Sequence, residues 1–291
     1  MTENLKNNKV IAVVGPTASG KTLYSIELAH KIDGEIISAD SRLVYRGFDI
    51  GTAKPSQKER GKIPHYMIDI VEPEVDYSAG LYVAQAKKLI KEIHSRGKIP
   101  IVTGGTGLYI NILLMNYDMP KVEPNYELRK QLKNTENLYE LLASLDSETA
   151  ENIDKNDRKK LIRAIEIIKT TGKTLSQVRG KNKSEFDVEW IGLNYPREVL
   201  YDRINQRVDL MIEEGLIEET KKLLEKHGRI NNILYTIGYQ EITAYLDGLL
   251  TLEEAVDKLK QNTRRYAKRQ LTWFRKNLDI KWNVYPEKLK K

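Results

Sequence analysis

Short apolar runs alternate with helical patterns through the first 116 residues of this 291-residue chain. Residues 10–14, 35–38 and 99–103 are rich in Val and Ile and end at Gly, Ser or Asp, which predicts three buried strands. Apolar residues recur at helical spacing over 21–31 and 80–95, and a further helix is expected from Leu108. This alternation predicts an α/β fold, with a central parallel sheet flanked by helices.

The strand pattern stops near residue 121 and returns near residue 187. Polar helical patterns fill the interval, at 128–132, 138–145 and 161–168, and a basic loop follows at 179–183. The pattern after the interval predicts a strand at 188–194, helices at 198–214, 217–226, 239–246 and 252–276, and a last strand at 280–285. We therefore expect two domains: a core made of 1–120 and 187–291, and a helical insertion domain at 121–186.

A complete phosphate-binding loop of the form G-x-x-x-x-G-K-[ST] stands between the first predicted strand and the first predicted helix. Its residues are Gly15, Pro16, Thr17, Ala18, Ser19, Gly20, Lys21 and Thr22. In such a loop, backbone N–H groups and a helix N-terminus converge on one anion, and the lysine adds a full positive charge. The core is thus predicted to be a P-loop core that binds a phosphorylated compound.

Two further polar segments follow predicted strands, Asp40 after the second and Thr106 after the third. Ligands of parallel sheets bind at the carboxyl ends of the strands, so both residues should lie near the phosphate-binding loop. ATPases and GTPases normally carry a Walker B aspartate at a neighbouring strand end. Here residues 103–106 are Thr-Gly-Gly-Thr, without an acid. This weakens the hydrolase interpretation and leaves small-molecule kinases open.

Composition narrows the possible partners and compartment. The chain has no cysteine, which excludes disulfides, cysteine zinc sites and thiol nucleophiles. Twelve Lys/Arg against two acids give residues 258–291 a formal charge of +10, so the rest carries −3 of the total +7. Such a basic block favours a polyanionic partner, nucleic acid above all, over a merely solvated helix. A polar N-terminus and the lack of a long apolar run favour a cytoplasmic protein with no membrane association.

Between Gly15 and about Arg275 the chain carries a series of motifs in a fixed order. They are the phosphate-binding loop, Ser-Ala-Asp-Ser at 38–41 with Tyr-Arg-Gly at 45–47, Asp-Ile-Gly-Thr-Ala-Lys-Pro at 49–55, Pro64-His65, Gly-Gly-Thr-Gly-Leu-Tyr at 104–109, Arg-Ala-Ile-Glu at 163–166, Ile-Gly-Tyr-Gln-Glu at 237–241 and Ala-Lys-Arg-Gln-Leu-Thr-Trp at 267–273. In these motifs the chain resembles the tRNA dimethylallyltransferases, also called tRNA isopentenyltransferases. The absence of cysteine matches the bacterial form, which has no zinc finger.

The resemblance implies a tRNA modification enzyme, a prenyltransferase. It would move a dimethylallyl group from dimethylallyl diphosphate to N6 of the adenine 3′ of the anticodon, at position 37 of tRNAs that read codons beginning with U. Diphosphate would leave intact and no nucleoside triphosphate would be needed, which accounts for a strong phosphate site without a Walker B acid. The implied cofactor is Mg²⁺, the implied partner is a tRNA anticodon stem-loop, and we expect a monomer.

The family motifs also imply roles at the site. Lys21 and the rest of the loop would hold the diphosphate, and the Thr22 hydroxyl would be a Mg²⁺ ligand. Asp40 would act as the general base toward N6, since the lone pair of an adenine amino group is delocalised into the ring. Thr106 would orient the amino group or the bridging oxygen of the diphosphate, and Arg207 would neutralise charge on the departing diphosphate.

Contacts with tRNA carry over from the family to three parts of the chain. The residues are Asp40, Ser41, Arg42, Leu43 and Thr106; Arg129, Lys159, Lys160 and Arg163; and Gly238, Tyr239 and Gln240 in the stretch 235–240. Arg42, and Lys159 with Lys160 where relatives carry Gln-Arg, depart from the usual pattern. We also consider Tyr45, Tyr109 and Tyr239 as platforms for flipped bases. The last helix should bury a stripe of Ala267, Leu271, Phe274 and Leu278, and offer its basic residues to phosphates.

Three other functions remain open from the residues. A nucleotide or small-metabolite kinase would use ATP and need no RNA. Prenyl transfer to free AMP, ADP or ATP would use the same donor, but would give no reason for the basic C-terminal block. A non-catalytic RNA-binding P-loop protein, using nucleotide as a switch, would tolerate loss of Asp40.

Overall fold

The computed structural model describes residues 8–115, 122–178 and 184–284 of the chain. Contacts divide the chain into two compact units, one formed by 1–110 together with 185–291 and the other by 111–184. We expected the insertion to begin at 121 from its helical pattern, whereas the second unit begins inside the helix α4 (Gly107–Leu114).

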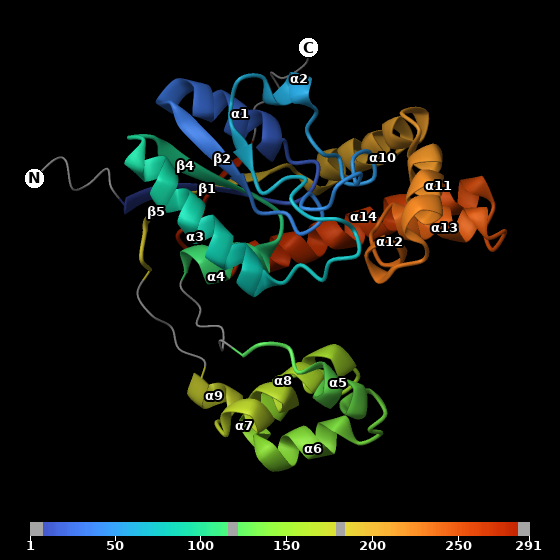
Figure 1. The fold of residues 1–291 in the computed structure, drawn as a ribbon. Coiled ribbons are helices and arrows are strands. Elements are labelled where there is room, and N and C mark those ends of the chain that lie inside the picture. The colour runs from blue at the N-terminus through green and yellow to red at the C-terminus, as the bar shows by residue number, and fades with distance from the viewer. Residues whose placement is uncertain (1–7, 116–121, 179–183, 285–291) are drawn as a thin grey trace, which may run out of the picture. The chain divides into compact units, whose positions relative to one another are not determined.

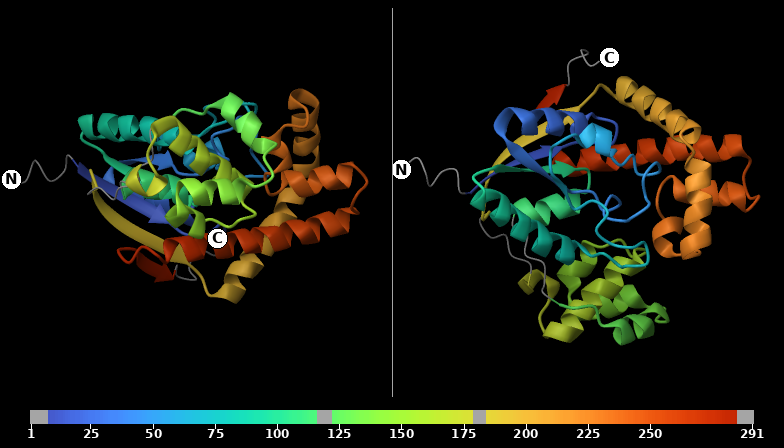
Figure 2. Two further views of the ribbon diagram at one scale, coloured as in Figure 1. Left: turned by 90° about the horizontal axis from the view of Figure 1, so that it is seen from below. Right: turned by 45° about the horizontal axis from the view of Figure 1, so that its top comes forward.

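The first unit is built on a sheet of six parallel strands in the order β3-β2-β4-β1-β5-β6. Their bounds are β1 Lys9–Val14, β2 Gly34–Ser38, β3 His65–Tyr66, β4 Ile99–Gly104, β5 Asp187–Asn194 and β6 Lys281–Val284. The last strand lies beside β5 at the edge of the sheet (Figure 2). The predicted α/β fold with a central parallel sheet is confirmed.

Helices cover both faces of this sheet, which explains why its strands are apolar without alternation. Helix α1 (Lys21–Ile32) and helix α3 (Ala79–Ser95) lie on opposite faces (Figure 1). On the α1 face, Ile26 and Ala29 pack with residues of four strands, among them Val13 and Ile101. The two-residue strand β3 and the four-residue helix α2 (Gln57–Arg60) were not predicted, because such short elements show no periodicity.

Five helices follow β5 and pack together beside the segment that leaves β2. They are α10 (Arg197–Glu213), α11 (Leu216–His227), α12 (Asn231–Leu234), α13 (Tyr239–Leu246) and the long α14 (Leu252–Phe274). Their shared core includes Phe48 from the β2 side and Leu223, Ile242 and Leu259 from the helices. The Glu219 carboxylate joins the two parts, accepting hydrogen bonds from the amides of residues 50 and 51 at 2.8 and 2.9 Å and from the Tyr239 hydroxyl at 2.7 Å.

The predicted apolar stripe of the last helix needs a correction. Ala267 and Phe274 are buried as expected, but the helix ends at Phe274 and Leu278, beyond it, is 93% exposed. The buried position between them is held by a polar residue, Gln270.

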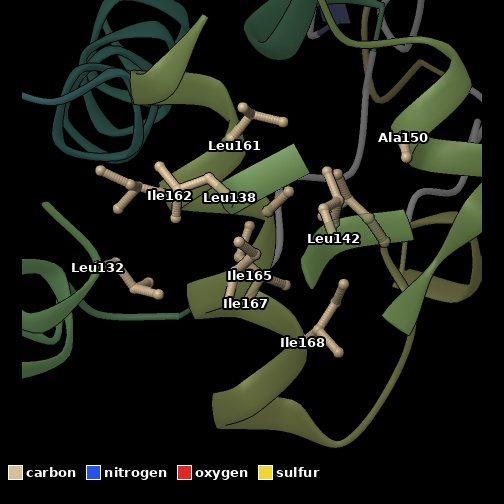
Figure 3. Packing of buried hydrophobic residues seen from close by; sticks show 11 residues of the cluster. Leu132, Leu138, Leu142, Ala150, Leu161, Ile162, Ile165, Ile167 and Ile168 are labelled. Atoms are coloured by element: carbon tan, nitrogen blue, oxygen red, sulfur yellow. The ribbon is translucent and has the colours of Figure 1, made fainter. Parts of the chain in front are cut away.

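The second unit is a small helical bundle with its own core. It contains α5 (Tyr126–Lys133), α6 (Leu138–Leu145), α7 (Ser147–Glu151), α8 (Arg158–Thr171) and α9 (Leu175–Val178). Leu132, Leu138, Leu142, Leu161 and Ile165 are among the residues that fill its centre (Figure 3). Helix α8 gives one side of this core, because its apolar residues recur at helical spacing. The basic loop at 179–183 lies outside the described residues.

A buried carboxylate organises one end of this bundle. Glu166 is fully buried on α8 and accepts hydrogen bonds from Arg129 at 2.8 and 2.9 Å, from Arg163, and from the Asn125 amide at 2.6 Å. Burial alone would raise the pKa of Glu166, but the bonds from Arg129, Arg163 and Asn125 outweigh it and keep the pKa below its ordinary value. The carboxylate is therefore charged at neutral pH and fixes both arginines.

Replacing Glu166 by alanine should destabilise the second unit. The change leaves two guanidinium groups and one amide without their shared acceptor, so we expect a loss of about 2 to 3 kcal/mol in the free energy of unfolding. Urea unfolding followed by circular dichroism measures it. Glu140→Ala, at an exposed position of α6, is the matched control and should change stability by less than about 0.5 kcal/mol. Equal effects of the two changes would contradict this account.

Across the described residues, the chain forms no helix with the length and apolar character that crossing a membrane requires.

Candidate functional site: a cation-lined cleft at the phosphate-binding loop

A cleft of about 1200 Å³ opens in the first unit where β1, β2 and β4 end. Thr17, Ala18, Gly20, Lys21 and Thr22 of the phosphate-binding loop line it, together with Asp40, Ser41, Arg42, Leu43, Arg207 and Gln240. Residues of α10, α13 and α14 complete the wall. The fold thus gathers predicted residues from four separate segments, because carboxyl ends of parallel strands share one edge of the sheet.

The phosphate-binding loop presents a helix N-terminus to the cleft. The loop turns tightly, with the Ser19 amide bonded to the Pro16 carbonyl at 3.3 Å and Ala18 in a left-handed conformation (φ 61°). Helix α1 then starts after Gly20, without a side chain capping it. The first amides of a helix have no partner within it, so those at the start of α1 are available to an anion.

Positive charge is concentrated around this N-terminus. Burial first, and then the charge of nearby Arg207, lower the pKa of Lys21 to about 7, while Asp40 acts in the opposite direction. Burial also lowers the pKa of Arg207, as does its neighbour Arg203, while Glu59 and Glu214 oppose the change. The Lys21 ammonium meanwhile donates to the Pro16 carbonyl at 2.6 Å. A bound polyanion would stabilise the charged forms of both Lys21 and Arg207, which burial and neighbouring cations disfavour in the free protein.

Asp40 and Thr106 are held next to each other by backbone contacts. The Thr106 hydroxyl accepts from the Ser41 amide at 3.0 Å, and one Asp40 oxygen, Oδ1, accepts from the Arg42 amide at 2.8 Å. The strand ends approach so closely that a Cβ on Gly104 would stand 2.2 Å from the Ala39 carbonyl oxygen. Among the recorded hydrogen bonds of the described residues none uses Asp40 Oδ2, which leaves that oxygen for a ligand.

Two residues of α14 at this site were given no role by sequence reasoning. Tyr266 lines the cleft, and its pKa is raised by burial first and then by the charge of Asp40, against the effects of Arg42, a hydrogen bond with Thr106, and Arg269. It therefore stays a neutral phenol. Gln270 is 5% exposed and bonds to the phosphate-binding loop. A polar residue inside an apolar helical stripe was the available signal for Gln270.

The proposed stacking platforms are wrong in this conformation. Tyr45, Tyr109 and Tyr239 are at most 4% exposed, so none can offer a ring face to a base. The Tyr239 hydroxyl is bonded to Glu219, and the Tyr109 ring stacks on Tyr82 at 4.2 Å between centroids. In the stretch 235–240, the aromatic ring that reaches the cleft is that of Tyr235, which is 64% exposed.

The other predicted tRNA contacts lie in two places. Gly238 is the N-cap of α13, where its amide is bonded to Glu241 at 2.8 Å, and it does not line the cleft. The residues of the second unit are Arg129, Lys159, Lys160 and Arg163; both arginines bind Glu166, and Lys160 pairs with Asp157 at 2.7 Å. Their contact with RNA stays a prediction.

Comparison with known proteins places this site in a family. Residues 43–277 match the family model described as IPP transferase. The tRNA dimethylallyltransferase of Anoxybacillus flavithermus is 48% identical over 94% of this chain and 89% of its own length. The chain belongs to the IPP transferase family.

Solved structures of related proteins agree with this membership. The tRNA isopentenylpyrophosphate transferase of Bacillus halodurans is 45% identical, with a TM-score of 0.73 over 95% of this chain and 90% of its own. A eukaryotic dimethylallyltransferase captured acting on tRNA is 31% identical, with a TM-score of 0.86 over 96% of this chain and 74% of its own. The family resemblance inferred from the motifs is thereby confirmed.

The cleft offers few ligands to a metal ion. No group of three or more His, Asp or Glu side chains that could hold a metal occurs in the described parts of the chain. Magnesium commonly keeps several waters and binds through one or two protein oxygens plus substrate phosphates. The exposed hydroxyl of Thr22 at the start of α1 fits that mode, with the diphosphate supplying the remaining oxygens.

Binding of diphosphate should protonate Lys21. In the free protein its pKa of about 7 leaves the ammonium partly deprotonated at neutral pH, and a bound polyanion raises that pKa. Proton uptake is therefore greatest between pH 7 and the raised value, and affinity for inorganic diphosphate should fall as pH rises through 7. Calorimetry in buffers of different ionisation enthalpy measures the uptake.

Lys21→Arg is the matched control for this experiment, because arginine keeps its charge throughout. At pH 7 the unaltered protein should take up roughly half a proton more than the variant, and titration of the ligand itself cancels in this difference. Equal uptake by the two proteins would show that Lys21 is already fully charged.

Proposed function

We propose that this protein is a tRNA dimethylallyltransferase, transferring the dimethylallyl group of dimethylallyl diphosphate to N6 of the adenine 3′ of the anticodon. One observation carries the proposal. Two cations and the amides at the start of α1 share one cleft with Asp40, while the end of β4 is followed by glycine and Thr106 where a nucleotide hydrolase would carry an acid. The relatives named for this activity support it.

The phosphate-binding loop would hold the leaving group. As the C–O bond to the donor carbon breaks, negative charge grows on the diphosphate, and Lys21, Arg207 and the amides at the start of α1 are already in place to stabilise it. Bound Mg²⁺, held by Thr22 and diphosphate oxygens, would supply additional positive charge. Because these groups are fixed before the reaction, little reorganisation is needed.

The carboxylate of Asp40 would prepare the nucleophile. N6 forms a bond to the donor carbon as the C–O bond breaks, the diphosphate takes the bonding electrons, and one N6 proton passes to Asp40. Oδ1 is fixed by the Arg42 amide, so Oδ2 is the atom we assign to the proton. Thr106, bonded to the Ser41 amide, would orient the amino group beside it.

An adenine in an anticodon loop fits this cleft because it is not base-paired and can leave its stack at low cost. Exposed Arg265, Lys268 and Arg269 on α14 would bind tRNA phosphates, and Arg42 would add a contact at the cleft. We further propose that the second unit is a tRNA-contacting insertion domain, and that the protein acts as a monomer in the cytoplasm on tRNAs that read codons beginning with U.

Incubation with dimethylallyl diphosphate, Mg²⁺ and bulk tRNA tests the reaction. Nucleoside mass analysis should show one C5 unit added to adenosine, with no consumption of ATP. Parallel reactions with AMP and ATP as acceptors test transfer to free nucleotides and should give no product. Asp40→Asn should lower kcat by about 10² to 10⁴, the usual contribution of a general base. Product formed at full rate by that variant would refute the base assignment alone, whereas ATP hydrolysis during turnover would favour a kinase.

The role of α14 in RNA binding can be tested by salt dependence. Each phosphate contact adds about one to the slope of log affinity against log salt. Arg265→Gln and Lys268→Gln should each reduce that slope for tRNA by about one, without changing the affinity for inorganic diphosphate. Lys31→Gln, at the exposed end of α1 remote from its N-terminus, is the matched control. An unchanged slope in both α14 variants would exclude this surface.

A further inference from the structure

One amide side chain joins the two halves of the cleft. The Gln270 carbonyl oxygen, Oε1, accepts the N–H of Thr17 in the phosphate-binding loop at 2.8 Å. Its amide nitrogen, Nε2, donates to the backbone carbonyl of Gly105 at 3.0 Å. Thr17 follows β1, Gly105 follows β4 and Gln270 lies in the last two turns of α14, so three distant segments meet in one buried group.

This contact helps to determine which backbone N–H groups of the loop can bind an anion. Thr17 gives its N–H to Gln270 and Ser19 gives its N–H to Pro16, so neither amide points freely at a ligand. The contact also holds the loop from outside. The other recorded tethers are Arg203, which donates to the Ala18 carbonyl at 2.9 Å, and Lys21, which donates to the Pro16 carbonyl. Lys21 belongs to the loop itself, whereas Gln270 and Arg203 reach it from other helices.

Glutamine suits this position better than a residue of similar shape. The site needs one acceptor facing Thr17 and one donor facing Gly105, and an amide supplies both. Glutamate would keep the acceptor but would place an anionic oxygen against the Gly105 carbonyl. The fit is close on the other side as well, because a Cβ on Gly105 would stand 2.1 Å from Gln270 Nε2. Gly105 and Gln270 therefore depend on each other.

We propose that Gln270 is a positioning residue that fixes the distance between the diphosphate loop and the loop that carries Thr106. Thr106 directly follows Gly105, and Thr17 belongs to the turn that aims the start of α1. A single rigid amide would therefore fix the position of the leaving group relative to Thr106, which orients the nucleophile. Small errors in such a distance slow reactions strongly. The inference rests on the proposed function only in taking a diphosphate as the ligand of the loop.

Two variants test the proposal, with inorganic diphosphate and Mg²⁺ as the binding probe and full-length protein throughout. Gln270→Leu removes both hydrogen bonds and should weaken diphosphate binding at least about tenfold. It should lower kcat by more than that factor, while affinity for tRNA measured without donor changes less than about twofold. Gln261→Leu, at an exposed position of α14, is the matched control and should leave both diphosphate binding and kcat unchanged.

Gln270→Glu gives a readout that a merely structural role would not move. The buried carboxyl should have a raised pKa, and in its protonated form it can again donate to the Gly105 carbonyl. We expect the variant to bind diphosphate more weakly than the unaltered protein, and the ratio of the two affinities cancels the titration of Lys21. This ratio should approach one as pH falls from 8 to 5.5. A constant deficit over that range would contradict the donor role of Nε2.

Diphosphate affinity and kcat within twofold of the unaltered protein in Gln270→Leu would overturn the proposal. So would a loss of tRNA affinity equal to the loss of diphosphate affinity, since that indicates general damage to the fold. The binding experiment contains no acceptor, so it remains informative if tRNA is not modified. Failure of the proposed function and failure of this inference are thereby distinguished.

Discussion

The burial of two cations, Lys21 and Arg207, in one cleft is the constraint on which the site depends. A protein gains nothing in stability from placing two cations together in a half-buried cleft, next to helix amides that carry partial positive charge. The arrangement becomes favourable when a compact polyanion fills it. In the proposed reaction, the groups that bind the diphosphate ester would bind the free diphosphate more strongly, because charge on that group increases as its bond to carbon breaks. Binding and catalysis would then rest on one electrostatic feature.

The rest of the fold keeps this cluster at a fixed distance from Asp40. The close approach of Gly104 to Ala39 joins the ends of β4 and β2, and Gln270 joins the end of β4 to the phosphate-binding loop. Glu219 ties the segment after β2 to the C-terminal helices. The contacts of Gln270 and Glu219 are polar contacts between helices and loops rather than apolar packing. Hydrogen bonds are directional, so they fix the distance and orientation of the segments they join, whereas apolar packing only brings segments close together.

Much of this could be read from the sequence, and the exceptions have physical causes. Strands buried on both faces and helices with one apolar face have clear patterns, so five of the six strands, α3 and α14 were predicted within a few residues. Tyr239 was considered for stacking because an aromatic ring near a cleft looks the same in sequence whether it faces solvent or core. In the fold it is buried in the core of the C-terminal helices, and its hydroxyl is bonded to Glu219. Leu278 continues the helical spacing of apolar residues in the sequence, but the helix ends before it, at Phe274.

Gln270 shows where sequence patterns stop being informative. The motif that contains it, at 267–273, could be recognised in the sequence. The role proposed for it depends on the N–H of Thr17, more than 250 residues away, and no local pattern encodes a contact between such distant residues. A glutamine within an apolar stripe indicates only that some buried partner exists, because an unsatisfied buried amide would be costly. Which partner it finds is decided by the sheet order, since β1 and β4 are neighbours although 84 residues lie between the end of β1 and the start of β4. The fold class could therefore be predicted from periodicity alone. The relative positions of the groups in the cleft, in contrast, depend on the order of strands in the assembled sheet.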